Sequence, residues 1–450
     1  MKKTIILAII CAIASNANAK NWLNFPDVEA ATIGIYIEDL KTGDVIASQN
    51  ENMAMTPASV TKSITSAATM LLLDKDFQFK TSVCAIGDTV IYNGVLNCDI
   101  IIEACGDPTI DSEHFPKNKV FIERITNSLI SKGITKINGD IIINSDNEKI
   151  NKVISTWMLE DIAWDYGAEP NAFNYNDNSF KIYLSSITDT ISVSKKIPEL
   201  VINNQLVEGE VNNILLYRPL YSNNLVVSGT IKPSISNYKI GCSMPNPAAV
   251  FIYDLKSRLA LSGISIAKKD YVEKKDTMLI YCHKSPTRDE ILRSLMVRSD
   301  NLFAEGMMQA INPMGNAIDS VMSKFKQIGI NCNTISLHDG SGLSRVDRLT
   351  PRFIANVYRY MYYSDLSSDY VALFPKSGYD GTLKNFLSNT RLKGRFALKT
   401  GSMDGVQCYG GYKLNEKGEP THIVVIMINN FFCKRNELRK DIERLLLQIF

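Results

Sequence analysis

The chain of 450 residues is too long for one ordinary domain of roughly 100–200 residues, so its length predicts about two to four structural units. Apolar residues make up 45% of the sequence and charged residues 21%, which excludes global disorder and collagen-like or coiled-coil structure. The 49 basic and 47 acidic residues leave a net charge of +2. That balance excludes nucleic acid or an anionic membrane as a main partner selected by charge.

The first nineteen residues have the pattern of a bacterial secretory signal peptide. Lys2 and Lys3 form a short basic region, residues 4–14 form an apolar run, and residues 17–19 (Ala-Asn-Ala) form a small-x-small cleavage site. The apolar run is too short to cross a hydrocarbon core of about 30 Å, which argues against a transmembrane anchor. We therefore predict cleavage after Ala19, export to the periplasm, and no transmembrane segment after cleavage.

The redox state of the cysteines depends on this compartment, because an oxidising compartment permits disulfides. Eight cysteines remain once the predicted signal peptide is removed. A two-residue turn at Asn93-Gly94 predicts a hairpin in which Cys84 lies opposite Glu103. In that register Cys105 lies diagonally across from Cys84 on the same face. The spacing makes Cys84–Cys105 a candidate bridge, and the alternative is that all the cysteines are free core thiols.

In chain order, residues 31–38 and 45–48 predict an antiparallel hairpin, and a helix is expected from Ser59 to Leu73. Residues 83–283 alternate short β-branched runs with turn residues and predict a mostly β block. The C-terminal part predicts helices again and then three strands. The expected helices are 285–311, 316–328 and 350–363, and the expected strands are 396–402, 407–414 and 421–430.

The last helix, predicted at 435–449, carries apolar residues on one side. It could pack on the adjacent sheet or lie on a membrane surface. Its acidic residues offset its basic ones, which is wrong for a membrane anchor and favours packing.

The sharpest local motif is Ser59-Val60-Thr61-Lys62 at the start of a predicted helix. Residues three apart share a helix face, so the Lys62 amine can reach the Ser59 hydroxyl. A helix N-terminus also offers free N–H groups and positive potential to a developing oxyanion. Taken alone, the motif is better explained by an N-cap serine beside a solvated lysine.

Two further motifs change that balance. Residues 299–301 read Ser-Asp-Asn after a predicted helix, and residues 399–401 read Lys-Thr-Gly on a predicted strand. Ser-x-x-Lys, Ser-Asp-Asn and Lys-Thr-Gly, in this order, are the set shared by penicillin-binding proteins and class A β-lactamases. The three motifs together favour a serine nucleophile activated by lysine.

Rival chemistries have weaker support. His338, Asp339 and Ser341 supply the residue types of a Ser/His/Asp site, but sequence neighbours rarely form a triad and no Gly-x-Ser-x-Gly elbow is present. No pair of His or Cys has zinc-ligand spacing, and no Gly-rich phosphate loop occurs. We expect neither a metal nor a cofactor.

The chain resembles the class C low-molecular-mass penicillin-binding proteins, the bacterial D-alanyl-D-alanine carboxypeptidase/endopeptidase family of serine peptidases. The resemblance covers nearly the whole chain after the predicted signal peptide. Beyond the three motifs it rests on Thr56-Pro57-Ala58-Ser59, Gly106-Asp107-Pro108-Thr109, Tyr166-Gly167-Ala168, Leu302 with Ala304-Glu305, Asp339-Gly340-Ser341-Gly342-Leu343-Ser344-Arg345, and Gly378-Tyr379-Asp380-Gly381-Thr382-Leu383.

This resemblance implies an α/β (α+β) transpeptidase/β-lactamase-like domain with a five-stranded antiparallel sheet between helices. The domain would be split over 20–82 and 284–450, around an inserted β-rich domain at 83–283 with a smaller domain nested at about 185–245. The 240 residues (299 − 59) between the first two motifs separate the chain from class A β-lactamases. A β-lactamase would also need a deacylating Glu after Ser-Asp-Asn, and the nearest imitation, 199–203, precedes that motif.

The resemblance further implies a serine D-Ala-D-Ala carboxypeptidase and endopeptidase that acts on peptidoglycan stem peptides and cross-links. Ser59 would form the acyl-enzyme, Lys62 would act as the general base, and Lys399 would depress the pKa of Lys62. Ser299 would relay a proton, and Asn301 would hold the peptide amide. β-Lactam antibiotics would acylate Ser59 and stay bound, and the alternatives are a serine β-lactamase or an inactive scaffold of the same fold.

Substrate-binding positions follow from the same resemblance. The N–H groups of Ser59 and Ser402 would hold the oxyanion. Lys399, Thr400 and Ser402, on the strand that includes Gly401, would receive the terminal carboxylate. Arg345 would lie near the end of the stem peptide, while Trp157 and Asp161 would approach a diaminopimelate amine, with Trp164-Asp165 as an alternative register. Met403 would line that pocket or fill space.

Overall fold

The computed structural model describes residues 28, 30–145, 154–268 and 276–450, so the predicted signal peptide lies outside the described residues. The chain divides into two compact units. The split unit consists of the residues up to Lys75 with Asp289–Ile311 and Asn316–Phe450, and the inserted unit consists of Asp76–Arg288 with Asn312–Gly315. These boundaries differ from those predicted at 82/83 and 283/284.

Strand pairing explains the difference in boundaries. Strand β3 (Lys80–Tyr92) pairs antiparallel with β14 (Asp276–Lys284), and Lys80 lies opposite Lys284. The first and last strands of the inserted unit are therefore neighbours in one sheet. A cut at residue 82 would pass through β3.

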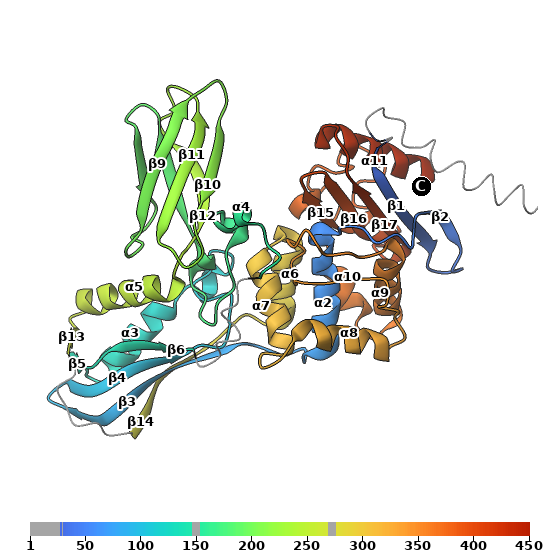
Figure 1. The fold of residues 1–450 in the computed structure, drawn as a ribbon. Coiled ribbons are helices and arrows are strands. Elements are labelled where there is room, and N and C mark those ends of the chain that lie inside the picture. The colour runs from blue at the N-terminus through green and yellow to red at the C-terminus, as the bar shows by residue number, and fades with distance from the viewer. Residues whose placement is uncertain (1–27, 29, 146–153, 269–275) are drawn as a thin grey trace, which may run out of the picture. The chain divides into compact units, whose positions relative to one another are not determined.

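The split unit is built on one antiparallel sheet with the strand order β15–β16–β17–β1–β2. β1 from the N-terminal segment pairs with β17 near the C-terminus, with Ile35 opposite Ile426. The two ends of the chain therefore meet in one sheet, and the predicted five-stranded antiparallel sheet between helices is confirmed (Figure 1). The strands are β1 (Thr32–Asp39), β2 (Val45–Gln49), β15 (Phe396–Met403), β16 (Val406–Leu414) and β17 (Pro420–Asn429).

Helices cover both faces of this sheet. On one face, Leu438, Ile442 and Leu445 of the last helix, α11 (Arg435–Ile449), are buried with alternate strand residues such as Ile35 and Ile426. The predicted packing of this helix on the adjacent sheet is therefore observed. The other helices are α2 (Thr61–Leu72), α6 (Arg288–Arg298), α7 (Asn301–Ile311), α8 (Ala317–Gln327), α9 (Pro351–Tyr363) and α10 (Ser367–Ala372), with the 3-10 turns η3 (Ala58–Val60) and η7 (Gly381–Leu383).

The single helix expected at 285–311 is wrong, because α6 ends at Arg298 and α7 begins at Asn301. Ser299 in the break has φ 64°, a left-handed conformation that costs free energy in a residue with a side chain. The apolar periodicity predicts one helix through this point, whereas the position of Ser-Asp-Asn after a predicted helix agrees with the break.

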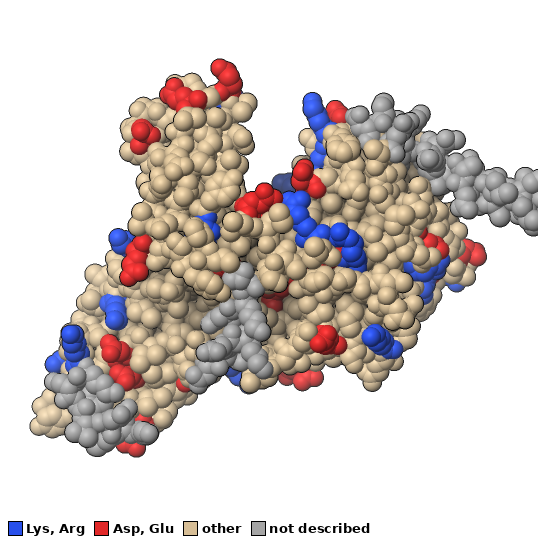
Figure 2. All heavy atoms as spheres, in the orientation of Figure 1, with Lys and Arg blue, Asp and Glu red and all other residues tan. Residues whose placement is uncertain are grey.

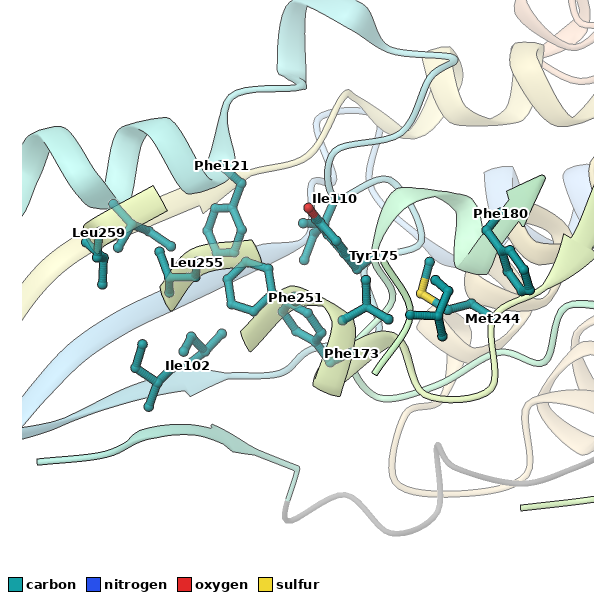
Figure 3. Packing of buried hydrophobic residues seen from close by; sticks show 14 of the residues in the cluster. Ile102, Ile110, Phe121, Phe173, Tyr175, Phe180, Met244, Phe251, Leu255 and Leu259 are labelled. Carbon is teal, nitrogen blue, oxygen red and sulfur yellow. The ribbon is translucent and has the colours of Figure 1, made fainter. Parts of the chain in front are cut away.

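The inserted unit contains a six-stranded sheet ordered β13–β5–β4–β3–β14, in which β6 also pairs with β4. Phe121, Phe251, Leu255 and Leu259 from its two long helices belong to the buried apolar cluster together with Ile102 of the sheet (Figure 3). Burial of such large apolar side chains is the main stabilising contribution. The elements are β4 (Val95–Glu103), α3 (Phe121–Ser131), β5 (Lys136–Asn138), β6 (Ile141–Asn144), α5 (Pro247–Leu261) and β13 (Ser265–Ala267).

Two three-stranded sheets complete this unit, ordered β12–β7–β8 and β10–β11–β9. The predicted nested domain at about 185–245 overlaps both, but β7 begins at Ser179 and pairs with β12. A separately folded nested domain stays a prediction. The strands are β7 (Ser179–Ser185), β8 (Thr190–Val193), β9 (Val201–Glu208), β10 (Asn213–Tyr217), β11 (Asn224–Ile231) and β12 (Tyr238–Ser243), and the short turns are η4 (Pro116–Asn118), α4 (Leu159–Ile162), η5 (Asp165–Gly167) and η6 (Asn176–Asn178).

The candidate disulfide Cys84–Cys105 is not formed, and none of the eight cysteines of the described residues is in a disulfide. The predicted hairpin between β3 and β4 is present, but its register shifts between Asp88 and Tyr92. Cys84 therefore lies opposite Ile101 rather than Glu103. An irregularity in one strand moves every later pair, and the sequence carries no sign of it.

Charges of both signs are interspersed on the surface in view (Figure 2). Most of this surface is formed by other residues, in keeping with the near balance of 49 basic and 47 acidic groups. No helix within the described parts of the chain is both long and apolar enough to span a bilayer.

Candidate active site

The predicted Ser59–Lys62 pair is brought together at the junction of η3 and α2. The Lys62 Nζ lies 2.9 Å from the Ser59 Oγ, and the Lys62 side chain is fully buried. Val60 is the N-cap of α2, and no side chain caps the helix. The alternative of an N-cap serine beside a solvated lysine is therefore wrong. Ala58, directly before the serine, has φ 46°, a strained conformation of the kind found at functional sites.

Three acceptors surround the Lys62 amine. In addition to Ser59, it donates to the Asn301 Oδ1 and to the Ser341 carbonyl oxygen, each at 2.6 Å. Three acceptors match the three N–H bonds of an ammonium group, so this buried group is fully satisfied. Asn301 was predicted from its motif, whereas the Ser341 carbonyl was not.

Burial lowers the pKa of Lys62 to about 8, because a charged amine is costly away from water. The carboxylates of Asp339, Glu305 and Asp300 oppose this shift. A lysine with a pKa near neutrality can lose its proton and act as a base. Lys62 can therefore take the proton of the Ser59 hydroxyl.

Lys399 forms the second half of the site. Its Nζ donates to the Ser299 Oγ at 2.9 Å and to the Thr400 carbonyl oxygen at 2.8 Å. Burial, with the charge of Lys62 as the second cause, holds the pKa of Lys399 well below its usual range. The predicted lysine–lysine repulsion therefore acts on Lys399, while burial accounts for the shift at Lys62.

Gly401 lets strand β15 approach the nucleophile turn closely. A Cβ at this position would lie 2.5 Å from the Pro57 carbonyl oxygen and 3.1 Å from the Ser59 backbone nitrogen. The backbone of the Lys-Thr-Gly strand is therefore adjacent to the N–H of the nucleophile residue, as an oxyanion site requires. The neighbouring Thr400 Oγ1 donates to the Thr382 Oγ1 at 2.7 Å, a contact that the motifs did not predict.

The rival Ser/His/Asp site is excluded by geometry. The His338 Nδ1 lies 3.2 Å from the Asp347 Oδ1, whereas the Ser341 hydroxyl donates to the Asp339 Oδ2 at 3.2 Å. Ser341 is fully buried, so its hydroxyl is not available to a substrate. The segment acts on the site through the Ser341 backbone instead.

The two residues predicted for the far end of the substrate lie in different units. Arg345 belongs to the split unit, in the segment that follows Ser341. Asp161 belongs to the inserted unit, is 8% exposed, and accepts a hydrogen bond from the Tyr166 hydroxyl at 3.0 Å. Burial, with Asp161 as the next cause, raises the pKa of the Tyr166 hydroxyl, which keeps it protonated as a donor.

In the alternative register, Trp164-Asp165, the Asp165 side chain lies against a neighbouring strand. A Cβ at Gly241 of β12 would lie 1.9 Å from the Asp165 Oδ2, so the Asp165 side chain packs directly on that strand. Trp157 is buried, at 7% exposure. Sequence reasoning missed Tyr166 as a partner of Asp161, although it named the Tyr-Gly-Ala segment.

A five-stranded antiparallel sheet with Ser-x-x-Lys, Ser-Asp-Asn and Lys-Thr-Gly gathered beside it defines a penicillin-recognising serine enzyme. The profile of the D-Ala-D-Ala carboxypeptidase 3 (S13) family matches residues 15–448, and the chain belongs to this family of serine peptidases. The family resemblance predicted from the motifs is confirmed.

Individual relatives agree with this assignment. The chain is 26% identical over 416 residues to the D-alanyl-D-alanine carboxypeptidase DacB of Haemophilus influenzae, covering 88% of this chain and 85% of that protein. It is similar in fold to the crystal structure of penicillin-binding protein 4 from the same organism, with a TM-score of 0.81 and 24% identity over 93% of this chain and 96% of that chain. A second structure of that protein, in complex with a β-lactam, matches with a TM-score of 0.76 over the same shares and at the same identity.

Proposed function

We propose that this protein removes the terminal D-alanine from peptidoglycan stem peptides and also cleaves D-alanyl cross-links, through an acyl-enzyme on Ser59. The observation that carries the proposal is the 2.9 Å contact between the Ser59 Oγ and a fully buried Lys62 amine. Burial lowers the pKa of that lysine to about 8, so that a neutral amine is available near neutral pH.

In acylation, neutral Lys62 takes the Ser59 proton while the Ser59 Oγ attacks the carbonyl carbon between the last two D-alanines. The carbonyl π electrons move to oxygen, and the N–H groups of Ser59 and Ser402 hold this oxyanion. When the intermediate collapses, the bond to the leaving nitrogen breaks. The proton returns from Lys62 through Ser299 to that nitrogen, so D-alanine leaves as a neutral amine.

Lys399 holds Ser299 for this relay and presents positive charge to the terminal carboxylate of the substrate. Its contact of 2.9 Å with the Ser299 Oγ supports the first role. Thr400 and Ser402, on either side of Gly401, supply hydroxyls for the same carboxylate. Asn301 binds the peptide amide, and its Oδ1 keeps Lys62 in place at 2.6 Å.

Water then attacks the ester carbonyl, and the bond between the acyl carbon and the Ser59 Oγ breaks. The proton from water passes through Lys62 to the Ser59 Oγ, which restores the enzyme. When a stem-peptide amine replaces the terminal D-alanine as the leaving group, the same reaction steps cleave a cross-link, which is endopeptidase activity. A β-lactam acylates Ser59 but stays, because its ring remnant remains attached and blocks the water. The β-lactam complex of the H. influenzae protein supports this part of the proposal.

In the split unit, Arg345 is proposed to contact the end of the bound stem peptide, with Met403 beside Ser402. In the inserted unit, Asp161 and Trp157 are proposed to contact a substrate amine. A carboxylate and an aromatic ring suit a substrate ammonium group. The hydrogen bond from Tyr166 fixes Asp161 for that role. We also propose that the chain is exported to the periplasm after cleavage at Ala19, and that the inserted unit, with a nested domain at about 185–245, serves this recognition.

A labelled-penicillin gel tests the acyl-enzyme. A labelled wild type and an unlabelled Ser59→Ala variant are expected, and an unlabelled wild type would contradict the proposal. Release of D-alanine from a pentapeptide and chromatography of cross-linked dimers measure the two activities separately. β-Lactam hydrolysis that is faster than peptide hydrolysis would identify a β-lactamase instead.

A further inference from the structure

The Glu305 carboxylate is a buried charged group that the mechanism above does not use. Glu305 lies on α7, one helical turn after Asn301, and is 3% exposed. Its Oε1 accepts the Ser341 N–H at 2.8 Å, and its two oxygens accept the Gly340 N–H at 3.1 and 3.0 Å. A carboxylate that accepts two backbone N–H groups with both oxygens fits the ionised form.

The segment that Glu305 holds through these N–H groups also reaches Lys62, one peptide unit further along the chain. The Ser341 carbonyl oxygen accepts the Lys62 amine at 2.6 Å, and the Gly340 carbonyl oxygen accepts the Thr65 hydroxyl at 2.6 Å. The segment is therefore held through its N–H groups by Glu305 of α7 and through two carbonyl groups by Lys62 and Thr65 of α2.

Glycine at 340 and 342 keeps the segment close to both helices. A Cβ at Gly340 would lie 2.9 Å from the Ala304 carbonyl oxygen, and one at Gly342 would lie 2.0 Å from the Ala58 carbonyl oxygen. The segment is thus wedged between α7 and the nucleophile turn. Displacing it by a small distance would move the acceptor of the Lys62 amine.

We propose that Glu305 is a positioning residue for the general base: it fixes the Ser341 carbonyl that receives the Lys62 amine, and its negative charge tunes the fraction of neutral Lys62. This inference rests on the proposed role of Lys62. The charged groups that face Lys62 are Glu305, Asp339 and Asp300, which favour its protonated form, and Lys399.

The direction of the electrostatic effect follows from these groups. Burial and the neighbouring Asp339 raise the pKa of Glu305 above its ordinary value, while its hydrogen bonds to Ser341 and Gly340 and the charge of Lys62 oppose that shift and favour the ionised form. The carboxylate in turn raises the pKa of Lys62 against the effect of burial. Removing the negative charge of Glu305 therefore lowers the pKa of Lys62 and moves the pH dependence of acylation to lower pH.

The test is the rate of Ser59 acylation by a labelled penicillin, measured from pH 5 to pH 10. In Glu305→Gln the amide NH₂ faces the Gly340 N–H, so the Ser341 carbonyl shifts. We expect acylation to slow by roughly 10- to 100-fold, the scale expected for a misplaced catalytic group, and the midpoint of its acidic limb to move to lower pH. Thr65→Val removes the other anchor without changing charge, and we expect a slower rate with an unmoved midpoint.

Glu38→Gln is the matched control. Glu38 is as buried as Glu305, at 3% exposure, but its carboxylate accepts hydrogen bonds from Arg359 and Tyr36 rather than from the segment that contacts Lys62. Its variant is expected to lose stability and to keep the wild-type acylation rate and midpoint. A general effect of losing a buried carboxylate is thereby separated from a specific effect on Lys62.

A folded Glu305→Gln protein with the wild-type rate and midpoint would overturn the inference while wild-type labelling still supports the proposed function. If Glu305→Gln does not fold, Thr65→Val decides, and a wild-type rate in that variant overturns the inference. A wild-type protein that takes up no label would overturn both the inference and the proposed function.

Discussion

The split unit and the inserted unit bury charged groups in different ways. In the split unit the Lys62 amine has three acceptors within 2.9 Å. In the inserted unit, Asp107 and His283 face each other at 3.8 Å, and the Asp107 Oδ2 and His283 Nε2 have no hydrogen-bond partner among the described residues. Buried charge is therefore arranged for proton transfer in the first unit and is only tolerated in the second.

Both units contain non-glycine residues with left-handed φ values, such as Ala58 in the split unit and Tyr221 in the inserted unit. In the split unit, Ala58 directly precedes Ser59, the proposed nucleophile, and Ser299 is the proposed proton relay. Each unit also has a buried apolar cluster, around Phe251 in the inserted unit and around Ile426 in the split unit. Function uses strained and polar positions that a well-packed scaffold has to support, so mutations in the two units should have different consequences.

The largest expected effect is on activity, from Lys62→Met. Removing the general base should slow Ser59 acylation by about 10²- to 10⁴-fold. The free energy of unfolding should change by less than about 2 kcal/mol, because loss of a buried charge offsets loss of its hydrogen bonds. Labelled-penicillin kinetics and urea unfolding measure the two quantities, and a fast variant would show that another group acts as the base.

Arg218→Met is the counterpart in the inserted unit. Arg218 is 2% exposed, donates to the Ser243 Oγ at 3.1 Å and faces Glu169 at 3.7 Å. Removing one member of a buried pair costs about 3–5 kcal/mol of unfolding free energy. The acylation rate per folded molecule should stay at the wild-type value. A large loss of that rate would break the contrast between the two units.

Two glycines allow a matched comparison of smaller effects. Gly342 has φ 74°, and a Cβ there would lie 2.0 Å from the Ala58 carbonyl oxygen. Gly342→Ala should therefore lower the free energy of unfolding by about 3 kcal/mol or more and slow acylation. Gly263 follows α5, has φ 79°, and would have no atom within 4 Å of an added Cβ. Gly263→Ala should lower the free energy of unfolding by about 1–2 kcal/mol and leave acylation unchanged. Thermal unfolding and acylation rates of both variants give the comparison, and equal effects on acylation would contradict it.

The smallest expected effect is the pH dependence from Asp107 and His283. Burial raises the pKa of Asp107 to about 6 and lowers that of His283 to about 4. Between pH 4 and pH 6 the folded state keeps a proton on Asp107 that the unfolded state loses, so this group lowers stability as pH rises. Over the same window the unfolded state keeps a proton on His283 that the folded state lacks, so this group raises stability as pH rises.

The two slopes oppose each other, so the pair should leave wild-type stability nearly independent of pH in this window. Asp107→Asn should expose the His283 slope, with stability rising with pH by up to about 1.4 kcal/mol per unit. His283→Gln should expose the opposite slope. Urea unfolding at pH 4, 5 and 6 checks both signs, and slopes of the same sign in the two variants would contradict the assignment.

Local patterns predicted much of this protein correctly. The Ser59–Lys62 contact follows from residues three apart on one helical turn. The strands at both ends of the chain follow from apolar and β-branched runs, and the packing of α11 follows from its apolar stripe. These features depend on neighbours in sequence, which is why periodicity and motif spacing are enough to predict them.

Other features depend on contacts between distant segments, and only the folded chain reveals them. The Ser341 carbonyl reaches Lys62 across 279 residues, and Glu305 lies behind it, so no motif links the three. An irregularity in β3 moved Cys84 away from the predicted register and removed the case for a disulfide. The left-handed conformation of Ser299 likewise has no signal in the helical periodicity, because surrounding packing rather than the propensity of serine holds it.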